Sequence, residues 1–182
     1  MNADLSIILV NYNEWEYLRH VLTLLATEFP DDQTEVIVVD NQSSDDSAAM
    51  VQKEFPAAKL IQSGRNLYYG KGNNLGLERS SGQWLMILNP DVDWQPGALR
   101  QFVKKAKTIH KLGAAGPQIR YRAGGIQYTS HRRFPSWLTV FVDYCLPLQQ
   151  LCLHLGLHPY LQSGATHQRT HRTSTMTGIC LL

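Results

Sequence analysis

The segment 85–93, LMILNPDVD, is the stretch from which the rest of the chain can be interpreted. Its apolar run has the length of a strand and stops at Asn89, and the carboxylates of Asp91 and Asp93 follow at once. Oxygen ligands at the end of a buried strand suit a hard divalent cation, and such a cation suits a ligand that carries phosphates. Asn, Pro and Asp are also the residue types of ordinary turns. The segment therefore predicts either a metal site or a short acidic turn.

Apolar runs of strand length alternate with helical patterns through the part of the chain before residue 112. We expect strands at 5–10, 36–39, 59–62 and 84–88, and helices from 13 to 26, 43 to 55, 73 to 80 and 96 to 110. Asn13 and Glu16 have the spacing of a capping box, and Pro96 suits a first helical turn. Such alternation predicts an α/β fold with a mostly parallel central sheet and helices on both faces.

Polar residues stand where three of these strands end. They are Asn11, the pair Asp40 and Asn41, and the segment 89–93. Because the carboxyl ends of parallel strands meet at one edge of a sheet, and ligands bind at that edge, we expect these residues to lie together. A ligand site there is a better interpretation than three unrelated turns.

The pattern changes after Gly113. We expect a further strand at 114–117, a hairpin formed by 118–121 and 126–129, and a strand that starts at 177. The apolar segment 138–157 is interrupted by Pro147 and Gly156, which favours one or two short amphipathic helices over a membrane span. The chain therefore divides into an α/β half, 1–112, and the start of a second half, 113–182.

Composition narrows the class of protein. The chain has 182 residues, of which 43% are hydrophobic and 18% charged, and its formal net charge of +2 gives no reason to expect a nucleic-acid partner. Three scattered cysteines are too few for a disulfide framework, which favours a reducing compartment. The N-terminus lacks the basic and apolar regions of a secretory signal, so we expect a cytoplasmic protein.

Four segments together resemble a known family. Residues 6–13 (SIILVNYN), 38–44 (VVDNQSS), 65–66 with 72–76 (RN and GNNLG) and 88–91 (LNPD) are similar, in order and spacing, to the family 2 glycosyltransferases with the GT-A fold. Asn-Pro-Asp and the segment 132–136 (RRFPS) look most like the rhamnosyltransferase-type branch. The resemblance is strong over 5–93, and 177–182 (TGICLL) is similar to the family's Gly-Ala-Cys-Leu-Leu strand.

The resemblance implies a function in cell-surface polysaccharide synthesis. It implies transfer of a sugar from a dTDP- or UDP-linked donor to a saccharide or lipid-linked acceptor, with inversion and with Mg2+ or Mn2+ as cofactor. Half 1–112 would bind the nucleotide sugar and half 113–182 would begin the acceptor side. Arg65 or Arg79 would help to stabilise the leaving diphosphate. The nucleotide-sugar-binding residues that the resemblance implies are Val10, Asn11, Tyr12, Asp40, Asn41, Arg65, Asn66, Asn73 and Asn89.

The metal motif departs from the family pattern. The usual Asp-x-Asp aligns with Asn89-Pro90-Asp91, so an amide replaces the first carboxylate and metal affinity should fall. Asp91 is the expected metal ligand, and Asp93 is a candidate to compensate for the lost charge. The family's catalytic base follows the Gly-Ala-Cys-Leu-Leu strand, so it is expected beyond Leu182, and the chain is expected to be a fragment.

Other interpretations are left open by the residues. A non-catalytic nucleotide-binding or regulatory module is the main alternative, whereas the glycines of 70–76 lack the spacing and position of a dinucleotide-binding loop. Asp40 suits a turn that leads into a helix, and Tyr12 suits simple packing. The oligomeric state, the sugar and the nucleotide base are undetermined by the sequence.

The last third contains two further patterns. An apolar stripe over 137–160, next to Arg132 and Arg133, suits packing against the sheet or a partner subunit, and alternatively peripheral contact with a membrane. Cys145 and Cys152 are expected to face a core. The pairs His154/His158 and His167/His171 have a four-residue spacing, but their surroundings favour ordinary loops over metal binding.

Overall fold

The computed structural model describes residues 3–31, 33–121, 123–125, 131–132, 137, 141, 145, 150–151, 154–155, 175–176 and 180–182. The chain forms two compact units. The first contains the residues up to Ala115 together with Gly178–Leu182, and the second is Gly116–Thr177. The expected hairpin strand at 126–129, three of the four histidines in the spaced pairs and most of the stripe 137–160 lie outside the described residues.

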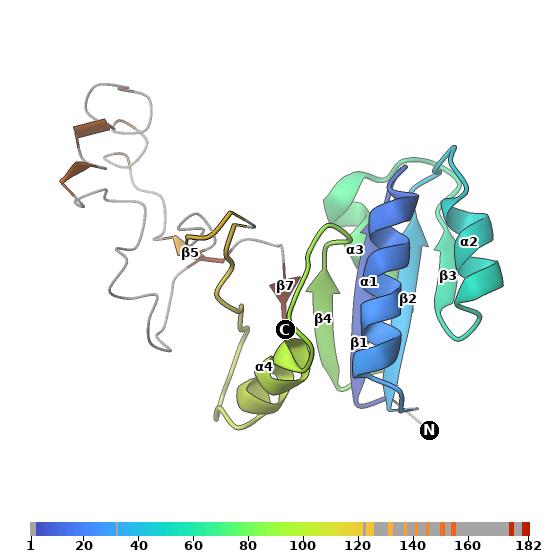
Figure 1. Ribbon diagram of the computed structural model, residues 1–182, viewed down its shortest axis with the longest axis horizontal. Helices are drawn as coiled ribbons and strands as arrows, with labels where there is room; N and C mark the ends of the chain where they lie inside the picture. The colour runs from blue at the N-terminus through green and yellow to red at the C-terminus, as the bar shows by residue number, and fades with distance from the viewer. Residues whose placement is uncertain are drawn as a thin grey trace. The chain divides into compact units, whose positions relative to one another are not determined.

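The first unit is built on one sheet. Its strands are β1 (Leu5–Asn11), β2 (Thr34–Asp40), β3 (Lys59–Gln62), β4 (Trp84–Leu88) and β7 (Cys180–Leu181), in the order β3-β2-β1-β4-β7. Strands β1 to β4 are parallel, and β7 pairs antiparallel with β4 (Figure 1). This arrangement confirms the mostly parallel sheet.

Four helices cover the sheet: α1 (Trp15–Glu28), α2 (Ser47–Glu54), α3 (Tyr68–Glu78) and α4 (Ala98–Lys107). Successive side chains of a strand point to opposite faces, so Ile8 and its neighbours in β1 bury different surfaces. A Cβ on Gly76 of α3 would lie 2.5 Å from Ile8 Cγ2 and 3.2 Å from Val39 Cγ2, which places α3 against the Ile8 face. The other helices share one core with the opposite face: Leu5, Ile7, Leu9, Leu18, Val21, Leu22, Leu25, Val38, Met50, Val51, Met86, Leu88, Leu99, Val103 and Ala106.

The strand order creates a switch point. The chain moves outward from β1 through β2 to β3 and then returns, by way of α3, to the other side of β1 at β4. In such sheets the crossovers on the two sides of the switch point lie on opposite faces, which leaves a crevice outside the carboxyl ends of the central strands. The crevice of this sheet is expected between the ends of β1 and β4.

The start of α1 differs from expectation. Asn13 and Glu16 do not form a capping box, because Asn13 adopts a φ of 57° and its Oδ1 accepts a hydrogen bond from Ser44 N at 2.7 Å. Instead, one carboxylate accepts hydrogen bonds from the first backbone N–H groups of both α1 and α2. Asp45 accepts hydrogen bonds from Trp15 N (3.2 Å) and Ser47 N (3.1 Å). For α1 this carboxylate comes from a different loop, the one before α2, which local spacing cannot reveal.

Two other helices also begin at unexpected positions. Helix α3 begins at Tyr68, well before residue 73, and Asn66 Oδ1 accepts a hydrogen bond from Tyr68 N at 2.8 Å. Helix α4 begins after Gly97, which has a φ of 84°, so Pro96 precedes the helix and is not part of its first turn. The four parallel strands agree closely with the apolar runs.

The C-terminal residues extend this sheet. The expected strand at 114–117 is not formed, because these residues have no regular secondary structure, but Ala115 and Leu182 exchange two backbone hydrogen bonds of 2.8 and 2.9 Å. In the second unit, β5 (His131–Arg132) pairs antiparallel with β6 (Thr175–Met176). Within the part of the chain that the structure describes, no helix has the length and apolar character needed to cross a membrane.

Candidate functional site

Asp40 joins three strand ends at the carboxyl edge of the sheet. Its side chain is 3% exposed, and its carboxylate accepts a hydrogen bond from Ser43 N at 3.1 Å and lies 3.4 Å from Asn11 Nδ2. Its backbone oxygen accepts hydrogen bonds from Ser63 N (3.0 Å) and Ser63 Oγ (2.9 Å), beyond the end of β3. The carboxylate is thus fixed beside the end of β1 by the backbone of its own loop.

Asn11 and Asn89 carry buried oxygens that have no hydrogen-bond partner among the described residues. Asn11 is fully buried, and its Nδ2 donates to Ser43 Oγ at 3.1 Å, but its Oδ1 accepts no hydrogen bond from the part of the chain that the structure describes. Asn89 Oδ1, at the end of the neighbouring strand β4, is likewise buried and unpaired within the described residues. A buried unpaired acceptor costs about 1–3 kcal/mol, and such groups in folded proteins call for a water, an ion or a ligand. The two oxygens flank the switch point.

The remaining amides of the site shape the loop before α3. Asn41 is buried, its Nδ2 donates to Tyr68 O at 3.3 Å, and its Oδ1 accepts from Leu67 N at 3.4 Å. Asn73 Nδ2 donates to Tyr69 O at 2.9 Å. These two amides and Asn66 therefore hold the backbone of 67–69 against the end of β2.

Left-handed backbone conformations gather at the same edge. Of four described non-glycine residues with positive φ, Asn13, Gln42 and Tyr68 follow β1, β2 and β3 respectively, and only Lys111 lies elsewhere. Asn tolerates this conformation, whereas other residues with a Cβ pay about 1–2 kcal/mol for it. Strain of this kind concentrates at functional sites. Sequence reasoning overlooked Gln42 and Tyr68, because neither residue type signals a left-handed turn.

The segment after β4 leaves the carboxyl edge between Asp91 and Asp93. Asp91 is exposed in the turn, whereas Asp93 Oδ1 lies 3.4 Å from His20 Nε2 and accepts a hydrogen bond from Trp94 N at 2.9 Å. His20 lies five residues into α1 past Trp15, about 7.5 Å along the helix axis from its start. Asp91 therefore lies at the edge, and Asp93 lies beside the middle of α1.

Glu28 fastens the far end of that segment. This buried carboxylate, at the end of α1, accepts hydrogen bonds from Trp94 Nε1 (2.9 Å), Gly97 N (3.1 Å) and Arg100 N (2.8 Å). Arg100 also donates to the backbone oxygen of Glu28 and forms a 3.6 Å ion pair with Asp31. Sequence reasoning did not single out Glu28. Its one signal is an acidic residue in the last turn of a helix, where the dipole disfavours it.

A family model establishes the relationship that these residues suggest. The model described as Glycosyl transferase family 2 matches residues 6–179. The chain belongs to glycosyltransferase family 2. The match covers nearly the whole chain, so the resemblance in the four segments that end at Asp91 is confirmed.

Curated relatives of this family 2 chain act on lipid-linked and other glycans according to their names. The "N-acetylglucosaminyl-diphospho-decaprenol L-rhamnosyltransferase" of Mycobacterium tuberculosis is 31% identical over 149 residues, 75% of this chain and 47% of the relative. The "Low-salt glycan biosynthesis hexosyltransferase Agl10" of Haloferax volcanii is 29% identical over 131 residues, 68% of this chain and 39% of the relative. The chain spans about half the length, or less, of these relatives.

Solved structures of glycosyltransferases share the fold. The mannosyltransferase PcManGT of Pyrobaculum calidifontis, in complex with GDP-Man and Mn2+, aligns with a TM-score of 0.59 at 23% identity over 66% of this chain and 36% of that one. TarS 1-349 of S. aureus, in complex with UDP, aligns with a TM-score of 0.60 at 23% identity over 70% and 39% of the two chains. The GT-A fold expected for this family 2 chain is confirmed.

The oxygen atoms of Asn89 and Asp91 at the end of β4 suit the binding of a hard divalent cation. Asn89 Oδ1 is a buried oxygen without a partner, and Asp91 adds an exposed carboxylate two residues later. Mg2+ is commonly held by one or two carboxylates, with waters and substrate phosphates as the other ligands. Among the described residues no group of three or more His, Cys, Asp or Glu side chains is placed to hold a metal. A cation here would therefore need further ligands from water or from the phosphates of a bound ligand.

The two arginines differ in position. Arg65 is exposed in the loop between β3 and α3, at the carboxyl edge. Arg79 follows the end of α3, and its backbone oxygen accepts a hydrogen bond from Lys59 Nζ, at the start of β3, at 2.7 Å. Arg79 lies at the opposite edge of the sheet, so the expectation that it assists a diphosphate is wrong. Helix α3 runs from one edge to the other, which local sequence did not reveal.

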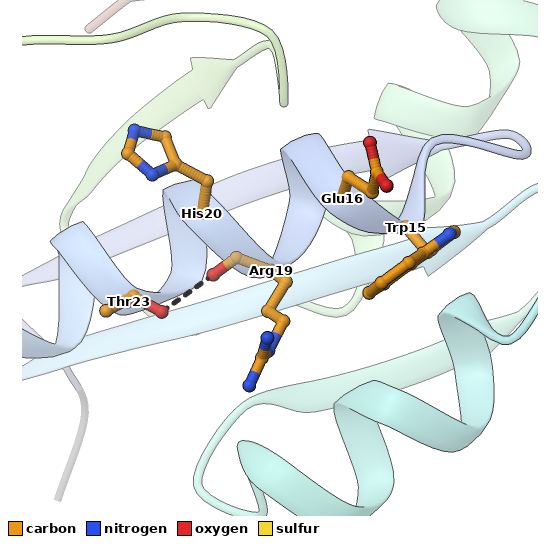
Figure 2. Close-up of a pocket in the computed structure, with 5 residues that line it drawn as sticks. All are labelled: Trp15, Glu16, Arg19, His20 and Thr23. Carbon is orange, nitrogen blue, oxygen red and sulfur yellow. Dashed lines mark hydrogen bonds between the residues drawn. The ribbon is translucent and has the colours of Figure 1, made fainter.

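A hollow on the outer surface of α1 lies apart from these strand ends. Its lining residues are Trp15, Glu16, Arg19, His20 and Thr23 (Figure 2). Thr23 Oγ1 donates to Arg19 O at 2.8 Å, and the Arg19 side chain pairs with Glu54 at 2.6 Å. Because the lining comes from one helix, the hollow lacks the convergence of loops from different strands that defines the carboxyl edge.

Proposed function

We propose that this chain provides the donor-binding part of a glycosyltransferase that moves a sugar from a dTDP- or UDP-linked donor to a saccharide or lipid-linked acceptor. The observation that carries the proposal is the meeting of Asn11, Asp40 and the Asn89–Asp91 turn at the switch point of a family 2 sheet. The names of a decaprenol-linked rhamnosyltransferase and of a UDP complex support the acceptor and donor classes.

The nucleoside would occupy the side of the site formed by β1 and β2. Asp40 can accept hydrogen bonds from the ribose or the base, and a charged acceptor gives a stronger bond than a neutral one. Asn11 Oδ1, which lacks a partner, would accept a further donor group. Val10 and the half-exposed Tyr12 would form the walls of this pocket.

The diphosphate would lie toward β4. Asp91 would ligate Mg2+ or Mn2+, and Asn89 would contribute its amide oxygen to the ion or to its bound water. When bound, such an ion stabilises the negative charge that develops on the departing nucleoside diphosphate. Arg65, exposed at the same edge, adds positive charge beside the phosphates. Asp93 is held beside His20 and would affect the ion less.

The acceptor side of the reaction is left to other groups. Single displacement with inversion requires a carboxylate that takes the proton of the acceptor hydroxyl. We assign that base to none of the residues 1–182. The chain's own contribution is to bind the donor, to orient its diphosphate and to hold the metal ligand.

We further propose that the protein works at the cytoplasmic face of a membrane, because a lipid-linked acceptor is found there. In the second unit the side chains of Trp137, Phe141, Leu151 and Leu155 are exposed. Exposed apolar side chains support peripheral binding to a bilayer surface. Co-sedimentation with anionic vesicles at low salt tests this, with Trp137→Ser as the matched variant, and failure of the unchanged chain to bind would exclude it.

The function is tested first by nucleotide binding and then by transfer. UDP, dTDP and GDP are titrated into the chain with Mn2+ and again with EDTA, and heat or fluorescence reports binding. We expect UDP or dTDP to bind in the presence of Mn2+. A chimera in which these 182 residues replace the matching part of the Mycobacterium tuberculosis relative then provides the transfer assay with a lipid-linked acceptor. Binding without transfer would favour a non-catalytic nucleotide-binding module, and no binding would reject the donor site.

A further inference from the structure

Tyr68 adopts a backbone conformation that is energetically unfavourable for a tyrosine. It has a φ of 57° at the first residue of α3, and its side chain is 77% exposed. A bulky aromatic residue is a clear outlier in this backbone region, whereas glycine adopts it freely. The ring also recovers little of this cost by packing, because most of it is in contact with solvent.

The surrounding side chains fix the strained conformation. Asn66 Oδ1 accepts a hydrogen bond from Tyr68 N at 2.8 Å, and Asn41 Nδ2 donates to Tyr68 O at 3.3 Å. Gly72, one turn later, approaches so closely that an added Cβ would lie 2.9 Å from Val10 Cγ1 and 3.3 Å from Asn41 Nδ2. The backbone position of Tyr68 is therefore set by the loop, which fixes where its side chain leaves the chain.

That place lies on the nucleoside side of the site. Asn41, which holds the Tyr68 backbone, follows Asp40 directly at the end of β2. Asn66, which holds the other side, follows β3. In the order β3-β2-β1-β4, the metal ligand Asp91 belongs to the far side of β1. The ring is thus closer in the fold to the proposed base and ribose than to the diphosphate.

We propose that the ring of Tyr68 stacks on the nucleobase of the donor. The inference rests on the proposed function of the edge and adds a contact to it. Aromatic stacking gives affinity for a base with little preference among bases, because every base has a π-face. Strain that persists at a binding site is compensated when the strained residue meets its ligand. Tyr68 would therefore raise affinity for the nucleoside, whereas hydrogen bonds that the base donates to Asp40 would determine which base is preferred.

Tyr68→Gly separates binding from stability. Glycine relieves the left-handed strain, so the melting temperature of the 182-residue chain is expected to rise by a few degrees. Affinity for UDP and for UMP is expected to fall about tenfold, the scale of one lost base–aromatic contact. The inhibition constant of inorganic pyrophosphate with Mn2+, measured in competition with UDP, should be unchanged. Tyr68→Phe keeps the ring and should keep the affinity.

Two controls make the result specific. Tyr68→Asn tolerates the left-handed backbone without an aromatic ring, and it should lose affinity as the glycine variant does. Tyr17→Ala removes another exposed ring, from the outer surface of α1, and should leave UDP binding unchanged.

Three outcomes would overturn the inference. If Tyr68→Gly binds UDP as tightly as the unchanged chain, the ring does not contact the base. If pyrophosphate affinity falls in parallel with UDP affinity, the ring acts only through the shape of the loop. Both results leave the proposed donor site intact. If the unchanged chain binds no nucleotide, the proposed function fails and this inference fails with it.

Discussion

The two edges of the sheet are built from similar polar residues but differ in how completely those residues are paired. At the amino edge, Glu35 accepts hydrogen bonds from Ser6 Oγ (2.5 Å), Ser81 N (2.5 Å) and Ser81 Oγ (3.0 Å), and Gly82 N donates to Ser6 Oγ at 2.8 Å. At the carboxyl edge, four buried side-chain oxygens have no partner among the described residues. They belong to Asn11, Ser47, Asn73 and Asn89.

Backbone strain follows the same division. Asn13, Gln42 and Tyr68 adopt positive φ in the loops at the carboxyl edge. The amino edge therefore satisfies its own polar groups and contributes to stability, whereas the carboxyl edge gives up stability and leaves acceptors unpaired among the described residues, as the proposed ligand site requires. Substitutions at the first edge should affect unfolding, and substitutions at the second should affect binding.

Gly82→Ala is expected to give the largest effect, at the amino edge. An added Cβ would lie 2.5 Å from Ser6 Oγ and 2.6 Å from Ser6 N, so the backbone itself would have to move. We expect a loss of about 3 kcal/mol in unfolding free energy, the upper range for overpacking. Urea denaturation measures it. Gly113→Ala, with nothing within 4 Å of the added atom, is the matched control. Equal stabilities of the two variants would contradict the close packing.

Asp91→Asn should remove the metal dependence of UDP binding at the carboxyl edge. A ligand at one hundred times its dissociation constant stabilises the folded state by about 2.7 kcal/mol, and this Mn2+-dependent stabilisation should disappear. Thermal unfolding with UDP, in Mn2+ and in EDTA, provides the measurement. Asp93→Asn serves as the control and should have the smaller effect, because Asp93 is engaged by His20 and Trp94. A larger effect at Asp93 would reverse the assignment.

Asp40→Ala should weaken nucleotide binding by about 2 kcal/mol, the scale of a lost hydrogen bond to a charged group. The loss should be the same in Mn2+ and in EDTA, because Asp40 lies two strands away from the β4 turn. Titration calorimetry in both buffers gives the comparison. Should Asp40→Ala unfold the chain, its bonds with Ser43 and Asn11 would be its principal role.

Asn89→Asp should strengthen metal binding by about 1 kcal/mol, because a second carboxylate adds charge to the ligand set. The concentration of Mn2+ that half-saturates the UDP response should fall severalfold. Asn89→Leu, which removes the unpaired oxygen but keeps the size, is the matched control and should raise that concentration. If both variants weaken the response alike, the Asn89 oxygen takes no part in holding the ion.

The smallest effect concerns pH and the amino edge. Burial raises the pKa of Glu35, but the hydrogen bonds from Ser6 and Ser81 and the charge of Lys59 outweigh it and hold the pKa below 4.5. A carboxyl group whose pKa is lower in the folded than in the unfolded state stabilises the fold at pH above the unfolded-state pKa. This stabilisation is lost as the pH falls through the folded-state pKa. We therefore expect the unchanged chain to be more stable than Glu35→Gln by less than about 1 kcal/mol. This difference in unfolding free energy should reach its maximum above pH 4.5 and disappear in acid. A constant difference across this range would refute the linkage.

The fold was predictable because its two central strands β1 and β2 are largely buried on both faces. Residues 5–10 and 36–39 form almost unbroken apolar runs, which the structure places in β1 and β2. The polar residues that end these runs converge because the connections make the strands parallel. The convergence of Asn11 with Asp40 follows directly.

The contacts that complete the site depend on tertiary structure. Asp45 caps α1 from the loop before α2, and Glu28 reaches three donors between Trp94 and Arg100. Neither partner is near in sequence, so no local spacing reports the pairing. Tyr68 was missed for a different reason, because its residue type contradicts the backbone conformation that the fold imposes.

The segment from Asp93 to Arg100, which we call the strap, runs along α1 and limits where the sequence can vary. Its start contacts His20 and its end is bonded to Glu28, while in the turn before it Pro90 is buried and Val92 packs against the core. The exposed residue Asp91 is therefore the position in this turn at which a substitution should disturb the core least. If the turn holds an ion as proposed, changes in ion preference within such a lineage would accumulate first at Asp91, whereas the strap has to be inherited as a unit with α1.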